Sequence, residues 1–272
     1  MANITKIVTL PDGKPITPLL LAKIDDSTYE KMKASFPLSD VCPTCDGAEG
    51  YYLDGVIHDC DCGVQKMLQK HYFASNIGRE YHDICLKDFI GSDTEKVVPT
   101  VLSYLEDFPS KFHYGLGLTF SGPVGTGKTF AMTCVLKELI KQGRDVYTIS
   151  FEEMINTWAS AWQDAETKRQ LEEKLKSVEV LGLDEVKLDN RSESFLASGL
   201  ESIVRHRTSN LLPTLITTNM TAPTLDSVFV KTASLLAARN EFIELEGKDL
   251  RLDEIRFRIM ELDANGERRP IC

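Results

Sequence analysis

The chain of 272 residues contains no run of eighteen apolar residues, which excludes a membrane-spanning helix of ordinary length. Its first residues, Met-Ala-Asn-Ile-Thr-Lys, lack the basic stretch and the apolar core of a secretory signal. Internal repeats and low-complexity tracts are missing too. With 42% hydrophobic and 26% charged residues, the composition is ordinary for a soluble globular protein. We therefore expect a cytoplasmic protein with no membrane partner.

The chain also has fewer basic than acidic residues. The chain has 31 Lys and Arg residues against 41 Asp and Glu residues, which gives a formal net charge of −10. A uniformly acidic surface repels phosphate backbones, so the total charge does not favour binding of nucleic acid. Any contact with nucleic acid is therefore expected from a local basic patch.

The cysteines do not suit a disulfide framework, because their number is odd and a secretory signal is missing. Four of the seven form a cluster, with Cys42-x-x-Cys45 followed after fourteen residues by Cys60-x-Cys62. Two such pairs on tight turns suit tetrahedral zinc, and four protein ligands indicate a structural site. His58 is an alternative ligand to one member of the second pair. The other interpretation is four reduced cysteines without a metal.

From about residue 96, short apolar strands alternate with helical patterns. Strands are predicted over 117–120, 146–149, 178–183 and 214–218, and helices over 97–108, 129–142 and 195–205. Ser150 and Glu153 form a capping box, and Gly143 lies where a helix ends in left-handed geometry. This alternation predicts an α/β fold with three αβα layers and a mostly parallel sheet.

Residues 122–129 read Gly-Pro-Val-Gly-Thr-Gly-Lys-Thr and fit the phosphate-loop pattern in full, between a predicted strand and a predicted helix. Glycines let backbone N–H groups point at phosphate oxygens, and the helix presents its positive end to the same anion. Lys128 is expected to reach the β- and γ-phosphates of ATP, and Thr129 to ligate magnesium. The residues expected to bind the nucleotide are Gly122, Pro123, Val124, Gly125, Thr126, Gly127, Lys128, Thr129 and Asp184.

Two further strand ends carry polar residues that suit ATP hydrolysis. Asp184 follows an apolar strand and is expected to hold magnesium, while Glu185 polarises the attacking water. Asn219 ends the fourth predicted strand, at the sheet edge where open α/β sheets bind ligands, and is expected to position the water. The alternative for Asn219 is a residue that only starts a turn.

Arginines complete many ATPase sites. Arg251, in the segment Gly-Lys-Asp-Leu-Arg, is a candidate for contact with the phosphates of its own subunit. Arg205, Arg207 and Arg239 are candidates for an arginine supplied to the ATP of a neighbour. Taken alone, each of them fits a surface residue better than a catalytic one.

Residues from about 96 to 265 resemble an AAA+ ATPase of the bacterial helicase-loader group, of the DnaC and DnaI type. The phosphate loop, Leu-Asp-Glu at 183–185, Pro-Thr-Leu-Ile-Thr-Thr-Asn at 213–219 and Gly-Lys-Asp-Leu-Arg at 247–251 lie in the expected order. The cysteine cluster before the ATPase resembles the DnaI-like, often phage-encoded, branch. One departure is Leu235, where related sequences carry an arginine that reaches a neighbour's γ-phosphate. Arg239, one helical turn later, is the replacement we expect.

The resemblance implies an ATP-dependent loader of the hexameric replicative DNA helicase, which self-assembles in the ATP state and acts on single-stranded DNA. It implies an N-terminal zinc-binding, helicase-interacting domain over 1–75, a connector over 76–95 and an AAA+ ATPase domain over 96–272. A segment over 151–176 grips single strands in the family. Here that segment mixes Lys and Arg with Glu, so a solvated helix with internal ion pairs is an equal alternative.

Two other functions remain open from the sequence. A transposition ATPase of the IstB type shares nearly the same core, although that type ordinarily lacks such a cysteine cluster. A non-enzymatic adaptor would use its zinc domain to bind a partner and ATP only as a structural ligand. The intact Lys128, Asp184 and Glu185 argue against the adaptor, whereas the missing arginine at position 235 argues mildly for it.

Overall fold

The computed structural model describes residues 8–9, 15–16, 45, 48, 50–53, 56–90, 93–159, 165–187 and 193–250. Two predicted site residues, Cys42 and Arg251, lie outside this part of the chain, as does most of the predicted N-terminal domain before residue 50.

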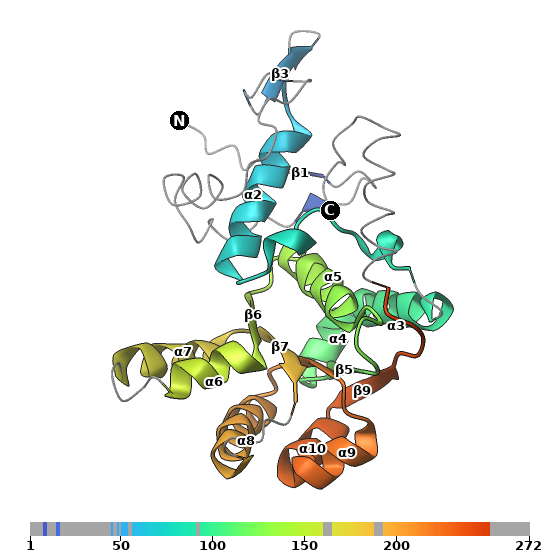
Figure 1. The fold of residues 1–272 in the computed structure, drawn as a ribbon. Helices are drawn as coiled ribbons and strands as arrows, with labels where there is room; N and C mark the ends of the chain where they lie inside the picture. Colours follow the sequence, from blue (N-terminus) through green and yellow to red (C-terminus); the bar gives the residue numbers. More distant parts are fainter. Residues whose placement is uncertain are drawn as a thin grey trace.

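A five-stranded parallel sheet forms the centre of the molecule (Figure 1). Its strands are β5 (Gly117–Ser121), β6 (Val146–Ser150), β7 (Val180–Val186), β8 (Thr214–Thr218) and β9 (Asn240–Glu244). Their spatial order is β6-β7-β8-β5-β9, and each neighbouring pair is parallel. Every residue of β5 and β8 is buried, as expected for inner strands of a parallel sheet that is covered on both faces.

Helices cover both faces of this sheet and create two separate apolar cores. The helices of the ATPase region are α3 (Thr94–Glu106), α4 (Phe108–His113), α5 (Lys128–Lys141), α6 (Phe151–Ala159), α7 (Ala165–Ser177), α8 (Glu193–Ser209), α9 (Ala222–Val228) and α10 (Val230–Ala237). One core gathers α3, α4 and α5, and the other gathers α6 to α10. The α/β fold with three αβα layers is therefore confirmed.

The structure confirms two helix ends that the sequence predicts. Gly143 has a φ of 81° after α5, and the Ser150 hydroxyl accepts the Glu153 N–H over 3.0 Å at the start of α6. Other boundaries were wrong. Strand β7 continues through Asp184 and Glu185, the pattern over 97–108 is divided between α3 and α4, and strand β9 was missed.

The described N-terminal segments form two small hairpins and a long helix. Strands β1 (Val8–Thr9) and β2 (Pro15–Ile16) pair antiparallel, as do β3 (Gly50–Leu53) and β4 (Val56–Asp59). Helix α2 (Asp61–Ala74) runs from the β3–β4 hairpin to the sheet, and its inner face shares a core with α5 (Figure 1). The division into domains at residue 75 stays a prediction.

A connector of two 3-10 turns, η1 (Arg79–Tyr81) and η2 (Leu86–Asp88), joins α2 to α3. Its first residues pair with β6, the edge strand of the sheet. The Ser75 carbonyl accepts the Thr148 N–H over 2.9 Å, and the Asn76 side chain donates to the Thr148 carbonyl over 3.1 Å. These contacts cover part of an edge that would otherwise present unpaired backbone groups.

Arg207 corrects one prediction, because it is completely buried and cannot reach the ATP of a neighbour. Its guanidinium donates to the Thr214 hydroxyl and to four backbone carbonyls, those of Leu175, Val178, Glu179 and Pro213. Burial lowers the pKa of Arg207 to about 9. The side chain therefore ties α8 to the end of α7 and to the start of β8.

Within the described part of the chain, no helix has the length and apolar character needed to cross a bilayer.

We predict that Arg207→Met lowers the free energy of unfolding by at least about 3 kcal/mol, because it strands several buried carbonyls without donors. Urea unfolding followed by circular dichroism measures the change. Arg205→Met is the matched control, since Arg205 is exposed and pairs only with Glu201 in the described structure. The control should stay within about 0.5 kcal/mol of the parent. Equal losses in both variants would contradict the structural role of Arg207.

Candidate nucleotide-binding site

The phosphate loop lies between β5 and α5, where the sequence predicts it. Gly125 and Gly127 have φ angles of 79° and 88°, a region in which only glycine is unstrained. Thr126 and Lys128 both donate to the Pro123 carbonyl, so the loop is closed on itself. Helix α5 begins at Lys128 and directs its first free N–H groups towards the loop. The loop has the backbone geometry of an anion site.

The carboxylate of Asp184 is held by two threonine hydroxyls. Thr129 donates to Asp184 Oδ1 over 2.9 Å, and Thr217 donates to the same oxygen. Burial raises the pKa of Asp184, while both hydroxyls favour its charged form. Thr129 and Asp184, the two predicted magnesium ligands, are thus adjacent and offer hard oxygen atoms.

Thr217 is a site residue that the sequence reasoning missed. Its hydroxyl accepts the Glu185 backbone N–H over 2.8 Å while it donates to Asp184. This N–H belongs to a residue with a φ of 53°, a conformation that non-glycine residues seldom adopt. Thr217 therefore fixes both carboxylate residues at the end of β7. Its position directly before the polar end of β8 was the available signal.

The side chain of Glu185 lies at the rim of the site, about half exposed. It is 3.7 Å from Lys187 Nζ, which is also 3.6 Å from a carboxylate oxygen of Glu152 on α6. Glu185 also lines a second, shallow hollow that is formed with the start of α6. Exposed ion pairs of this kind contribute little energy, so Glu185 is easily reoriented.

A pocket lies between the phosphate loop, the ends of β7 and β8, and the connector. Asn219 is exposed and lines this pocket, as predicted residues Lys128 and Thr129 do. Another part of its wall comes from the connector and includes Tyr81 and Phe89. Phe89 lies so close to the loop that a Cβ on Gly127 would come within 2.8 Å of its ring. No motif in the sequence pointed to this aromatic wall.

The segment after β9 runs along the phosphate loop. Leu245 N–H donates to the Ser121 carbonyl over 2.8 Å, and Leu250 N–H donates to the Gly125 carbonyl over 2.9 Å. Leu250 also lines the pocket. This path brings the Gly-Lys-Asp-Leu-Arg segment to the nucleotide site up to Leu250, while Arg251 lies outside the described residues.

Arg239 is not part of the site of its own subunit. Its backbone carbonyl accepts the Gly117 N–H, at the start of β5, and its guanidinium donates to the Tyr114 carbonyl. The phosphate loop follows the opposite end of β5, and a five-residue strand is roughly 16 Å long. A role of Arg239 or the exposed Arg205 towards a neighbour stays a prediction.

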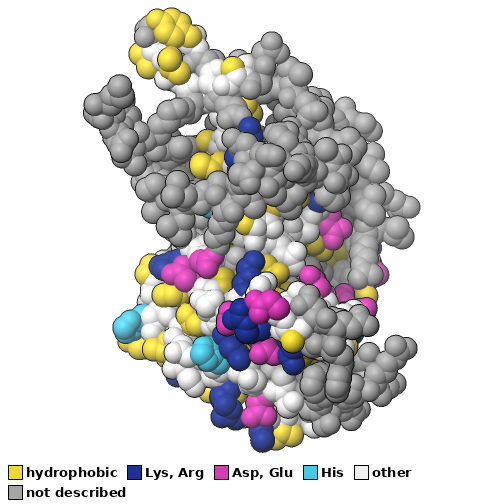
Figure 2. All heavy atoms as spheres, turned by 90° about the vertical axis from the view of Figure 1, so that its left-hand side faces the viewer, with side chains coloured by type: hydrophobic (Ala, Val, Ile, Leu, Met, Phe, Trp, Pro, Cys, Tyr) yellow, Lys and Arg dark blue, Asp and Glu magenta, His cyan; other side chains and the backbone are white. Residues whose placement is uncertain are grey.

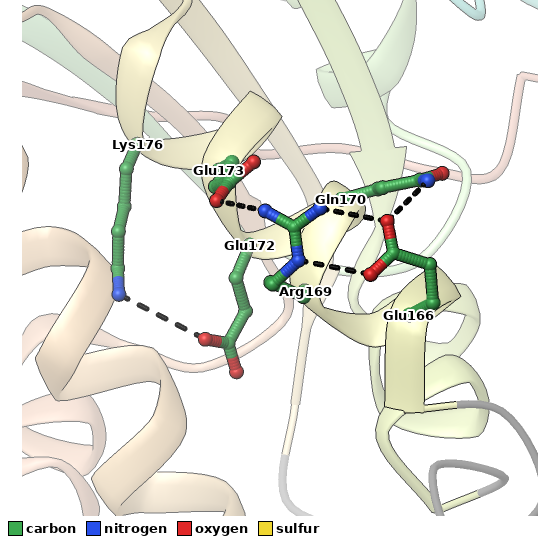
Figure 3. A network of polar contacts seen from close by, with 6 residues as sticks. All are labelled: Glu166, Arg169, Gln170, Glu172, Glu173 and Lys176. Carbon is green, nitrogen blue, oxygen red and sulfur yellow. Dashed lines mark hydrogen bonds and ion pairs between the residues drawn. The ribbon is translucent and has the colours of Figure 1, made fainter.

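The basic residues of α7 contact acidic residues of the same helix or, for Lys174, a tyrosine of β6. Arg169 bonds Glu166 and Glu173, while Lys176 lies 3.9 Å from Glu172 (Figure 3). Lys174 stacks on the ring of Tyr147, with its Nζ 3.8 Å from the ring centroid. On the described part of this face, positive and negative side chains alternate instead of forming a continuous basic surface (Figure 2). The structure thus agrees with a solvated helix that carries internal ion pairs.

Three of the four clustered cysteines converge. The sulfur atoms of Cys45, Cys60 and Cys62 all lie within 4.8 Å of one another. Tetrahedral zinc with Zn–S bonds of about 2.3 Å places sulfurs roughly 3.8 Å apart, so these three fit such an ion. Cys60 is buried at the N-cap position of α2, where its side chain makes no capping hydrogen bond. His58 is exposed on β4 and is not part of this group of described residues.

Comparisons with known proteins agree with this geometry. Residues 115–243 match the family model described as IstB-like ATP binding protein. The replicative helicase loader DnaI of Bacillus subtilis is 26% identical over 181 residues, which cover 62% of this chain and 56% of DnaI. The chain therefore spans little more than half the length of this relative.

Solved structures show the same architecture. The crystal structure of the DnaC helicase loader superposes with a TM-score of 0.55 and 21% identity, covering 62% of this chain and all of that one. AMPPCP-bound DnaA from Aquifex aeolicus superposes with a TM-score of 0.53 and 21% identity, covering 68% of this chain and 56% of DnaA. The AAA+ fold and the resemblance to helicase loaders, both expected from the sequence, are confirmed.

Proposed function

We propose that the chain binds ATP with magnesium in this pocket and hydrolyses it. The loop from Gly122 to Thr129 receives the phosphates, and the aromatic wall of the connector receives the base. Thr129 and Asp184 hold magnesium, which neutralises charge on the phosphates. The observation that carries the proposal is the convergence of Lys128, Thr129 and Asp184 at one loop, in a chain that matches an ATP-binding family.

For hydrolysis, Glu185 polarises the attacking water and Asn219 positions it. Both side chains line the pocket, although Glu185 must turn away from Lys187 to act. Lys128 stabilises the charge that develops on the transferred phosphoryl group. Arg251 contacts the phosphates of the same subunit, and Arg239 serves a neighbouring subunit after self-assembly.

We infer that ATP turnover drives the loading of a hexameric replicative DNA helicase onto single-stranded DNA during replication initiation. The similarity to DnaI supports this inference. So does an N-terminal region with its own cysteine cluster and an apolar hairpin end, where Tyr52, Leu53, Val56 and Ile57 are exposed (Figure 2). This region is the proposed surface for the helicase, and Cys42, Cys45, Cys60 and Cys62 are its proposed zinc ligands.

A second candidate is a transposition ATPase, which the IstB-like family match favours. The two functions differ in the partner protein, since a transposition ATPase acts with a transposase. We prefer the helicase-loader function, because the chain has a cysteine cluster beside an apolar hairpin.

The first prediction concerns Thr217. Thr217→Val should lower the rate of ATP hydrolysis by about 10–100-fold, because it removes the donor that orients a magnesium ligand. Phosphate release under saturating ATP measures the rate. Thr217→Ser keeps the hydroxyl and should retain most of the activity. If the serine variant were as slow as the valine variant, the hydroxyl would not be the active feature.

The second prediction tests the partner. Glu185→Gln should bind ATP without turnover and thereby retain the hexameric helicase in affinity capture from host lysate. Lys128→Ala should bind neither ATP nor, in consequence, the helicase in an ATP-dependent manner. Addition of ATP to purified helicase, circular single-stranded DNA and the parent protein should increase the amount of helicase on DNA.

Tyr52→Asp with Ile57→Asp in the Glu185→Gln bait serves as the surface control, because both residues are exposed on the hairpin, and it should abolish helicase capture while ATP binding is kept. Recovery of a transposase by the intact bait would give first place to the transposition ATPase. Recovery of neither partner by a bait that binds ATP would contradict both assignments and favour an adaptor.

A further inference from the structure

Lys137 lies in the second half of α5, a little over two turns after the phosphate loop, and is almost completely buried. Its ammonium donates to three backbone carbonyls, those of Tyr81, His82 and Ile84, over 2.7–2.8 Å. An ammonium group has three N–H donors, so each has an acceptor here. All three acceptors belong to the connector.

The connector residues that Lys137 holds are next to the nucleotide pocket. Tyr81 supplies one of the three carbonyls, and its side chain lines the pocket. Phe89 follows Ile84 by five residues, packs against Phe130 of α5 with ring centroids 5.8 Å apart, and lines the same pocket. The lysine thus fixes the backbone from which the aromatic wall projects.

The same ammonium also reaches the N-terminal part of the molecule. It lies 4.9 Å from the ring centroid of Tyr72 on α2, a cation–π contact. His82 packs edge-on against Tyr72 and Phe73, and its Nε2 bonds the Ile77 carbonyl over 3.0 Å. Burial lowers the pKa of His82 to about 4, so this ring is neutral at physiological pH. Burial also lowers the pKa of Lys137 to about 7. Helix α2, the connector and α5 therefore meet at this one buried amino group.

Hydrogen bonds to the three connector carbonyls require a flexible side chain with several donors. A buried methionine of similar length would take the Lys137 donor away from all three carbonyls, and each lost hydrogen bond would weaken the attachment of the connector. A lysine used only for packing would not need to join three carbonyls from one short segment. The contacts instead hold the connector where Tyr81 and Phe89 line the pocket.

We propose that Lys137 is a positioning residue for the nucleotide base: it holds the connector so that Tyr81 and Phe89 form the base-side wall of the pocket. The proposal rests on the proposed binding of ATP at this site. Beyond that function, it assigns recognition of the phosphates and recognition of the base to different residues. The phosphate loop recognises phosphates without Lys137, whereas recognition of the base requires it.

Binding of two probes tests the separation. In isothermal titration calorimetry with magnesium, Lys137→Met should bind ATP at least about tenfold more weakly than the parent, a loss in the range of one base-stacking contact. Inorganic tripolyphosphate, which lacks a base, should bind the parent and the variant within about twofold of each other. A general collapse of the site would weaken both probes, and that result would overturn the proposal.

Lys141→Met is the matched control, because it places the same substitution one helical turn further along α5. Lys141 pairs with Glu138 over 2.6 Å in the described structure, so ATP binding should stay within about twofold of the parent. Equal loss of ATP affinity in the two variants would overturn the special role of Lys137. Failure of the parent protein itself to bind ATP would instead contradict the proposed function.

Hydrogen exchange on the unaltered protein provides a test that does not depend on how a variant folds. ATP should slow amide exchange over residues 81–90 by at least about threefold more than tripolyphosphate does, since only ATP fills the base side. Both probes should protect residues 122–129 equally. Equal protection of the connector by the two probes would overturn the proposal.

Discussion

Helix α5 organises the molecule, because its two functions are built on one rigid element. Its first turn presents free N–H groups and the positive end of the helix dipole to the phosphate loop. Its middle holds the buried ammonium of Lys137, to which the connector and α2 are attached. The rest of the helix is buried between the sheet and α3, so neither function can shift independently of the core.

A second constraint acts at the carboxyl edge of the sheet. Strands β7 and β8 are adjacent and parallel, so the polar ends of both strands meet beside the phosphate loop. Thr217 joins these ends by bonding both Asp184 and the backbone of Glu185. The proposed magnesium ligands are fixed in this way, whereas Glu185 remains at the exposed rim beside Lys187. We expect such a site to hold the proposed nucleotide in a fixed geometry, while the proposed catalytic carboxylate of Glu185 lies at its exposed rim.

Features that depend on local sequence were predictable. The phosphate loop, the four strands and the ends of α5 and α6 follow from glycine positions, apolar runs and a capping box, which act within a few residues. Contacts between distant segments were not. Arg207 was one candidate for an arginine supplied to a neighbour, and only the fold shows that it donates to the carbonyls of Leu175, Val178 and Pro213, at the end of α7, just after it and just before β8. The roles of Lys137 and of the aromatic wall likewise depend on how the connector folds back onto α5.

The central claim is that one pocket, between the phosphate loop and the connector, binds ATP. Photolabelling with 8-azido-ATP, followed by mass spectrometric mapping of the modified peptides, tests it most directly. The azide sits on the adenine base, so the account predicts label in residues 77–90, competed away by excess ATP but not by excess GMP. Competed label that falls instead on α8 to α10 would place the base elsewhere and contradict the account.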